Sequence, residues 1–310
     1  MSKFQALKKS SQSEFDKLTE KLNELNTKFQ KDERFWELSV DKAGNGYATI
    51  RFLPRLEEEP LPFVRFWDHG FKGVGGWYIE LSRTSLKDPD TGEVQADPVT
   101  EYNALRWEEG QNSPGRDFVS GKQGKPGSKR RLHYISNIYV INDPVHPENN
   151  GKVFLFQYGK RIFDKLNGLM NPDFEDKKKV NPFDLWTGVT FTIRAKKVDG
   201  QRNYNDSEWG TPGPLADDET MEKIYDQQYP LLPFLDEKRF KSYEELDRKL
   251  KRVLGTNSPT THATVEAAIA QPKTESTKTA TPAPKQDETP PWSTDDDDAD
   301  IAAFEALVNK

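Results

Sequence analysis

The chain has 310 residues, of which 34% are hydrophobic and 31% are charged, and it contains no cysteine. This composition excludes disulfide bonds, a thiolate zinc site and a cysteine nucleophile. No apolar run is long enough to cross a membrane, and no signal-peptide hydrophobic region follows Met1, so we expect a soluble intracellular protein. The low hydrophobic content predicts that part of the chain is not packed into a core.

The net charge of −6 is distributed unevenly along the chain. Residues 1–30 carry six lysines and four acids, whereas residues 256–310 carry four lysines and ten acids. The acidity is therefore concentrated in the C-terminal tail, and the body of the chain is close to neutral. Because charges are screened over about 10 Å at ordinary salt, local basic clusters decide whether the body can bind a polyanion.

The N-terminal segment predicts a basic amphipathic helix. Apolar side chains recur at three- and four-residue spacing between residues 15 and 29, and Ser11 or Ser13 can serve as the N-cap. The apolar stripe is narrow, so we expect the helix to dock on the chain's own body or on another copy.

From residue 35 the pattern becomes typical of β-structure. Residues 36–40 and 47–53 predict two strands joined by a hairpin turn, and residues 63–69 and 77–81 predict two more strands around a glycine-rich turn. In the strand 47–53, alternate apolar residues are expected to face the core. Residues 86–128 are polar and predict a long loop with one short helix at 101–109.

Basic and aromatic residues gather between residues 129 and 166. Three cations precede a predicted strand at 132–141, turn residues follow, and a second strand with an aromatic face is predicted at 153–158. Cations beside aromatic strands suit a single-stranded nucleic acid, because phosphates need charge and unstacked bases need flat rings. A buried aromatic core with solvated cations at its rim has the same pattern, and the local sequence leaves both interpretations open.

The remaining elements are a helix at 162–169, a half-buried strand at 189–196 and an exposed loop at 200–204. A last helix begins at Ser242, where Glu245 completes a capping box, and ends at Gly255. Beyond residue 255 the composition predicts a disordered linker. The chain closes with a block of carboxylates beside a hydrophobic anchor, which we interpret as a protein-docking tail. The residues of this tail are Asp295, Asp296, Asp297, Asp298, Asp300 and Phe304.

Short antiparallel strands with a long insertion predict a mainly β fold with α additions. We expect an oligonucleotide-binding (OB) core, which is a five-stranded Greek-key barrel, with an inserted subdomain and flanking helices. A metal-dependent nuclease built on the acids at 88–93 or 217–219 is disfavoured, because no His or Lys is placed to complete such a site. A single-stranded RNA-binding regulator and a non-catalytic adaptor scaffold remain open from the residues alone.

Several short runs resemble the single-stranded DNA-binding (helix-destabilising) proteins of T-even-type bacteriophages. They include DKAGNG at 41–46, IRFLP at 50–54, HGFK at 69–72 and GWYIE at 76–80. Further matches follow in the same order at 143–154, 159–165, 203–204 and 241–246. The resemblance extends from Trp36 to Gly255.

The resemblance implies three parts and a function. A basic self-association segment would occupy residues 1–32 and an OB-fold DNA-binding core residues 33–255, with an insertion at 65–128, followed by a disordered linker and acidic tail at 256–310. The implied function is cooperative, largely sequence-independent coating of single-stranded DNA in viral replication, recombination and repair, in the cytoplasm of an infected bacterial host. The implied partners are single-stranded DNA, further copies of the chain, and polymerase, primase-helicase-loading and recombination-mediator proteins that bind the tail.

The resemblance also assigns residues. The self-association motif is matched by Lys8, Lys9, Ser10 and Ser11. The residues that we expect to bind single-stranded DNA are Lys129, Arg130, Arg131, Tyr134, Phe156, Tyr158, Lys160, Arg161, Tyr204, Arg51 and Lys72. We further expect that replacing Arg130, Arg131 and Phe156 together weakens DNA binding and leaves the fold intact.

One departure from the family concerns metal. Its best-known members hold a structural zinc with one His and three Cys, and here only His69 keeps its position. Ser82 replaces the first Cys, and Asp97 and Thr100 replace the other two. Hydroxyls and one carboxylate do not make a structural zinc site, so we expect no zinc and a subdomain held by packing. The side chains that we expect to contribute are Trp77, Tyr78, Leu81 and Trp107.

Overall fold

The computed structural model describes residues 32–88, 91–110, 112–122, 125–198 and 201–256. The predicted N-terminal helix, the self-association motif and the acidic tail lie outside these residues. The chain separates into two units, Met1–Trp36 and Glu37–Lys310. In the first unit the structure describes only residues 32–36, which end in the short strand β1 (Phe35–Trp36). All that follows concerns the second unit.

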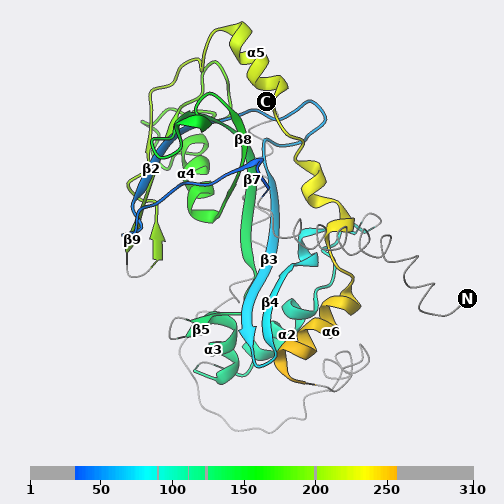
Figure 1. The fold of residues 1–310 in the computed structure, drawn as a ribbon. Coiled ribbons are helices and arrows are strands. Elements are labelled where there is room, and N and C mark those ends of the chain that lie inside the picture. The colour runs from blue at the N-terminus through cyan, green and yellow to red at the C-terminus, as the bar shows by residue number, and fades with distance from the viewer. Residues whose placement is uncertain (1–31, 89–90, 111, 123–124, 199–200, 257–310) are drawn as a thin grey trace, which may run out of the picture. The chain divides into compact units, whose positions relative to one another are not determined.

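The second unit is built on one antiparallel sheet (Figure 1). Across it lie, in this order, β8 (Val153–Tyr158), β7 (Arg131–Asn142), β2 (Gly46–Phe52), β9 (Phe191–Val198) and β10 (Gln201–Asn203). β11 (Glu208–Trp209) pairs with β9. The predicted mainly β character is confirmed, whereas the Greek-key OB topology stays a prediction.

The long strand β7 joins this part of the sheet to a hairpin. One half of β7 pairs with β2, and its other half pairs with β3 (Val64–Gly73). β3 continues past the end of β7 and pairs with β4 (Gly76–Leu81) around a tight turn. Both hairpin strands were predicted from their sequence, and both are confirmed.

The strand β2 shows what alternation predicts and what it misses. Ala48, Ile50 and Phe52 are all fully buried, as the pattern indicates. The turn before β2 also forms, because the Asp41 carboxylate accepts the backbone N–H groups of Ala43 and Asn45. The predicted hairpin partner at 36–40 does not pair with β2, whose neighbours are β7 and β9.

Five α-helices belong to the described part of the second unit. They are α2 (Pro98–Trp107), α3 (Pro114–Ser120), α4 (Lys160–Met170), α5 (Asp218–Asp226) and α6 (Tyr243–Leu254). Short 3-10 turns lie at Arg83–Ser85, Pro147–Asn149, Leu232–Leu235 and Glu237–Arg239. The capping box of Ser242 and Glu245 that begins α6 is confirmed. The helices α3 and α5 were not predicted, although each has an N-cap side chain, Ser113 and Asp217.

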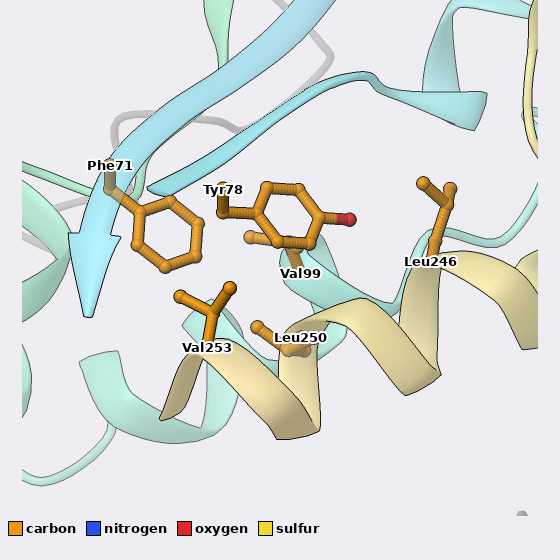
Figure 2. Packing of buried hydrophobic residues seen from close by; sticks show 6 residues of the cluster. All are labelled: Phe71, Tyr78, Val99, Leu246, Leu250 and Val253. Atoms are coloured by element: carbon orange, nitrogen blue, oxygen red, sulfur yellow. The ribbon is translucent and has the colours of Figure 1, made fainter. Parts of the chain in front are cut away.

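The inner face of the β3–β4 hairpin packs on helices. Phe71 of β3 and Tyr78 of β4 point toward α6 and α2 (Figure 2) and stack with their ring centroids 5.1 Å apart. The side chains that complete this cluster are Val99, Leu246, Leu250 and Val253. At ~1.5–3 kcal/mol for each fully buried large apolar side chain, these contacts are a sufficient reason for α6 to join a hairpin 170 residues earlier.

We call this assembly the hairpin subdomain; it comprises β4, the far half of β3, α2, α3, α6 and the two-residue strands β5 (Gly121–Lys122) and β6 (Lys125–Pro126). The expectation that packing contributes is correct for Tyr78, which is fully buried. It is wrong for Trp77, which is 53% exposed because it points away from this cluster.

Candidate nucleic-acid interface

The aromatic residues predicted to stack on bases lie in the core of the sheet. Tyr134, Phe156 and Tyr158 are 3%, 5% and 3% exposed. Tyr134 lies parallel to Phe163 of α4 at 4.1 Å between ring centroids, and the Tyr158 hydroxyl is 2.8 Å from that of Ser136. Rings from α4 and from β2 cover this face of β7 and β8. The structure therefore places these three rings in the core, and not on an exposed stacking surface.

Two of the predicted cations are also internal. Arg51 is 1% exposed, and its guanidinium donates hydrogen bonds to the carbonyl oxygens of Asp184 and Gly213 at 2.8 and 2.9 Å. Burial lowers the pKa of Arg51, and Asp184 partly opposes this shift. Arg130 is 8% exposed, because its guanidinium lies 4.1 Å from the Trp67 ring and donates to Thr84. Both side chains hold loops and strands together instead of facing phosphate.

A second group of predicted residues meets at the start of α4. Arg161 donates to the carbonyl oxygen of Arg202 at 2.7 Å, and Lys165 donates to that of Asn205 at 3.3 Å. These bonds hold the loop that carries Tyr204, which is half-buried. Lys160 is exposed and pairs with Asp164. The structure thus brings α4, which carries Arg161, to the loop that carries Tyr204, although the two are far apart in the sequence.

The outer face of the β3–β4 hairpin carries exposed cationic and apolar side chains. Since successive strand residues point to opposite sides, Trp77 and Ile79 point away from the cluster that buries Tyr78. They are 53% and 60% exposed. Across the ladder Trp77 is paired with Lys72 and Ile79 with Gly70, and Lys72 is exposed. We call the surface of Lys72, Trp77, Ile79 and Arg131 the outer hairpin face.

Arg131 is fixed on this face by Asp68. Its guanidinium donates two hydrogen bonds to the Asp68 carboxylate, at 2.8 and 2.7 Å, and His133 lies 3.1 Å from the same carboxylate. Burial would raise the pKa of Asp68, but the bonds from His133 and Arg131 outweigh it and hold that pKa below its usual value. The guanidinium occupies the space that a side chain at Gly70 would need. Arg131 therefore lies flat on β3 with its side chain still 48% exposed.

Lys129, just before β7, is exposed as well. Of the predicted DNA-binding residues, the structure leaves six at least partly accessible. They are Lys72, Lys129, Arg131, Lys160, Arg161 and Tyr204.

The positions that correspond to the family's zinc ligands hold a hydrogen-bonded network. Asp97 caps α2 by accepting the backbone N–H groups of Val99 and Thr100, and it also accepts that of Arg83. His69 donates from Nδ1 to the Ser128 carbonyl oxygen at 2.9 Å, and its Nε2 lies 3.2 Å from Asp97 Oδ1. Both side chains are almost fully buried.

The electrostatics of Asp97 follow from this network. Burial would raise its pKa, but the contact with His69 and the backbone N–H groups outweigh that effect and lower the pKa to about 2. The Asp97 oxygens are thus taken by backbone and imidazole, and the Ser82 hydroxyl lies 2.9 Å from that of Thr84. In the described ranges no group of three or more His, Cys, Asp or Glu could hold a metal ion. These donors do not suit a structural zinc.

The acidic clusters considered for a nuclease have structural partners. Asp217 caps α5 by accepting the backbone N–H of Thr220, and Asp88 accepts the backbone N–H of Thr91 in a turn. Each carboxylate closes a local backbone motif, which is the ordinary use of Asp at such positions.

A β-sheet with exposed aromatic and cationic side chains is typical of proteins that bind unpaired nucleic acid. Residues 44–254 match the family described as gp32 DNA binding protein like, and the chain belongs to this family. It is 36% identical over 231 residues to the single-stranded DNA-binding protein of Enterobacteria phage T4, covering 73% of this chain and 71% of that protein.

The protein of the same name from Enterobacteria phage T2 is 36% identical over 232 residues, with the same coverage of both chains. A shorter match, 46% identical over 63 residues, joins 20% of this chain to 56% of the single-stranded DNA-binding protein of Escherichia phage SV14. These relatives confirm the resemblance inferred from the short runs. They are binding proteins, in agreement with the prediction that the chain is not an enzyme, and their phage origin indicates a phage-infected bacterial host. None of the described helices combines the length and apolarity that a membrane crossing requires.

Trp77 is an exposed residue whose position differs from the prediction made from its sequence. It was expected to pack inside the subdomain together with Tyr78. The signal that could have separated them is the alternation in GWYIE, which puts Trp77 and Ile79 on one face and Tyr78 on the other.

Proposed function

We propose that this protein binds single-stranded DNA without strong sequence preference and coats it. The observation that carries the proposal is the match to proteins named single-stranded DNA-binding protein over 73% of the chain. The exposed cations and the indole of the outer hairpin face support it, because they offer charge and a flat ring on one surface. The absence of sequence preference follows from the chemistry, since every base has a π-face and every nucleotide has a phosphate.

Phosphate binding falls to the accessible cations. Lys72, Lys129 and Arg131 lie on or next to the hairpin and β7, and Lys160 and Arg161 lie at the start of α4. Each phosphate that a cation neutralises releases condensed counterions, so affinity falls steeply as salt rises. The negative net charge of the whole chain does not oppose this, because the acidity is concentrated in the tail.

The flanking segments supply assembly in this proposal. Residues 1–32, with Lys8, Lys9, Ser10 and Ser11, bind the core of the next copy and make coating cooperative. The tail from Asp295 to Phe304 binds replication, recombination and repair proteins of the virus in the cytoplasm of its host. In the absence of DNA, the acidic tail competes for the same basic surface. Deleting residues 285–310 should therefore tighten DNA binding, and unchanged affinity would contradict that role.

The proposal includes a hairpin subdomain that folds without zinc. The apolar cluster of Phe71 and Tyr78 supports this because it packs the hairpin on α2 and α6, and the contact of His69 with Asp97 supports it because it joins two positions that match the family's zinc ligands. Elemental analysis of chelator-washed protein should find a molar ratio of zinc to protein far below one. Stoichiometric zinc would overturn it.

The proposed function is tested by tryptophan fluorescence titration of the full chain with poly(dT), poly(U) and duplex DNA at two salt concentrations. Binding to poly(dT) should be tight, should weaken strongly at the higher salt, and should exceed binding to the duplex. Equal or tighter binding to poly(U) would favour the single-stranded RNA-binding regulator. No salt-sensitive binding to any of the three would overturn the proposal and favour the adaptor that binds acidic proteins.

A further inference from the structure

We infer that Trp77 is a base-stacking position and that the outer hairpin face carries part of the single-stranded DNA path on the hairpin subdomain. This inference rests on the proposed function and adds to it Trp77, which we expected to pack inside the subdomain, and the exposed surface that Trp77 shares with Lys72 and Arg131.

Packing inside the hairpin subdomain does not account for the position of the Trp77 side chain. Tyr78, its neighbour on β4, is fully buried in the inner cluster, whereas Trp77 is 53% exposed (Figure 2 shows Tyr78 pointing toward α6). Within the described part of the chain, the Trp77 side chain has no ring contact, ion pair or hydrogen bond. An indole left half in water without a partner is available to stack on a flat ligand.

Cationic side chains lie beside the indole of Trp77. Lys72 is directly opposite Trp77 in the ladder, so their Cβ atoms are about 4.5–5.5 Å apart. Among the described residues Lys72 has no ion pair, so its ammonium is free to meet a phosphate. The Arg131 guanidinium lies over Gly70, which is on the same strand as Lys72 and is diagonal to Trp77, at about 7–8 Å. The indole thus has two cations beside it, both over the neighbouring strand β3.

Asp68 offsets the charge of Arg131 but leaves that of Lys72, and the Arg131 side chain is still 48% exposed. Asp68 is the carboxylate on the same face, and it is already bonded to Arg131 and His133. Glu80 belongs to the opposite face, where it pairs with Lys241 and Lys249. The face therefore keeps cationic charge beside one aromatic ring, which is complementary to a phosphate chain with unstacked bases, whereas a purely apolar partner would leave this charge without a counterion.

The outer hairpin face belongs to a rigid part of the molecule. The hairpin is held from behind by the stacked rings of Phe71 and Tyr78, by the α6 cluster and by the ion pairs of Glu80. A surface that is already ordered loses little conformational entropy when the ligand binds, so stacking energy appears as affinity. This distinguishes the outer hairpin face from a flexible loop that carries an aromatic residue.

The experiment compares Trp77→Ala with Trp186→Ala in the full chain, by anisotropy of a labelled oligo(dT). Trp186 is a matched control because it is 58% exposed but donates its indole N–H to Asp218, the first residue of α5. Trp77→Ala should weaken binding about 5- to 150-fold, the range for one stacked base. Trp77→Phe, which keeps a flat ring, should retain most of the affinity, and Trp186→Ala should bind like the unchanged protein.

A second readout separates stacking from charge. Trp77→Ala should leave the slope of log affinity against log salt unchanged, whereas Lys72→Gln should lower that slope by about 1. If Trp77→Ala lost its fold, the same question is answered by fluorescence: Trp77→Phe should lose part of the quenching caused by DNA, and Trp186→Phe should lose none of it.

The inference is overturned if Trp77→Ala binds as tightly as the unchanged protein, if Trp186→Ala is weakened as much, or if Trp77→Phe keeps the full quenching. These outcomes leave the proposed function standing, provided the unchanged protein binds the oligonucleotide. Failure of the unchanged protein to bind it refutes the proposed function itself, so the two failures are distinguishable.

Discussion

Two aromatic strand segments beside cations have opposite environments in this protein. In β8 the side chains of Phe156 and Tyr158 share one face of the strand next to the cations of α4, and both are buried. In β4 the side chains of Trp77 and Ile79 share one face in the same way beside Lys72, and both are exposed. The local patterns are alike, and the difference is what lies above each face.

The covering elements explain the difference. The aromatic face of β8 is closed by rings from other elements, including Phe52 of β2, while α4 contributes Phe163 against Tyr134 of β7. On the inner side of the hairpin, α2 and α6 pack against Phe71 and Tyr78, whereas Trp77 and Ile79 on the outer side are exposed. A period of two along a strand tells which residues share a face, but it does not tell which face is covered. Four predictions test this contrast, from the largest expected effect to the smallest.

Phe156→Ala should lower the free energy of unfolding by about 3–5 kcal/mol, because it leaves a cavity among packed rings. Urea denaturation measures this, with Trp77→Ala as the exposed control that should change stability by about 0.5 kcal/mol or less. The earlier expectation that a variant with Arg130, Arg131 and Phe156 replaced keeps its fold is corrected accordingly, since Arg130 and Phe156 are buried. If the Phe156→Ala protein were stable but no longer bound DNA, Phe156 would be a DNA-contacting residue and not a core residue.

Asp97→Asn should lower the free energy of unfolding by about 3 kcal/mol at neutral pH, because it removes the buried charge that His69 and the backbone N–H groups stabilise. The pKa of Asp97 is lowered from 3.8 to about 2 in the folded protein, so its contribution is complete above pH 3.8 and is lost as pH falls toward 2. The stability gap between the two proteins should therefore close over that interval. A chelator should change neither protein; destabilisation of the unchanged chain by chelator alone would reveal a metal.

Arg130→Gln and Arg131→Gln compare a buried and an exposed cation on consecutive residues. Arg130→Gln should cost about 1–3 kcal/mol of stability, because the contacts with Trp67 and Thr84 are lost, and it should leave the salt slope of DNA binding unchanged. Arg131→Gln should cost at most about 1 kcal/mol of stability and lower the salt slope by about 1. Urea denaturation and anisotropy at several salt concentrations measure both. If instead Arg130→Gln lowered the salt slope and Arg131→Gln lowered the stability more, then Arg130 would be the cation that contacts DNA and Arg131 the one that supports the fold.

Gly70→Ala should have the smallest effect. The added methyl group meets the guanidinium of Arg131, which is the end of a flexible side chain and can move aside. We expect stability to change by about 0.5 kcal/mol or less and DNA affinity to fall by less than in Arg131→Gln. Anisotropy of the labelled oligonucleotide measures it, with Gly168→Ala as a control, since a methyl group there meets no neighbouring atom. An affinity loss equal to that of Arg131→Gln would mean that the flat placement of Arg131 is essential to binding.

The sequence by itself determined the elements whose signals are local. Alternation identified β2, β8 and β9, strand-forming composition identified β7, a glycine-rich turn marked the hairpin of β3 and β4, and the side chains of Ser242 and Glu245 marked the start of α6. The order and spacing of short runs also identified the family, which the relatives confirm. The strand and cap patterns involve residues that are close together in the sequence, and the family is identified by the order of its motifs. Neither depends on contacts between distant segments.

Only the tertiary structure decided which residues are buried and which face solvent. Arg51 reads as a surface cation until the carbonyl groups of Asp184 and Gly213 close around it, more than 130 residues away in the chain. Trp77 reads as core until α6 and α2 are seen to take the other side of the hairpin. Burial is set by contacts between distant segments, and a strand pattern carries no information about the element that will cover it.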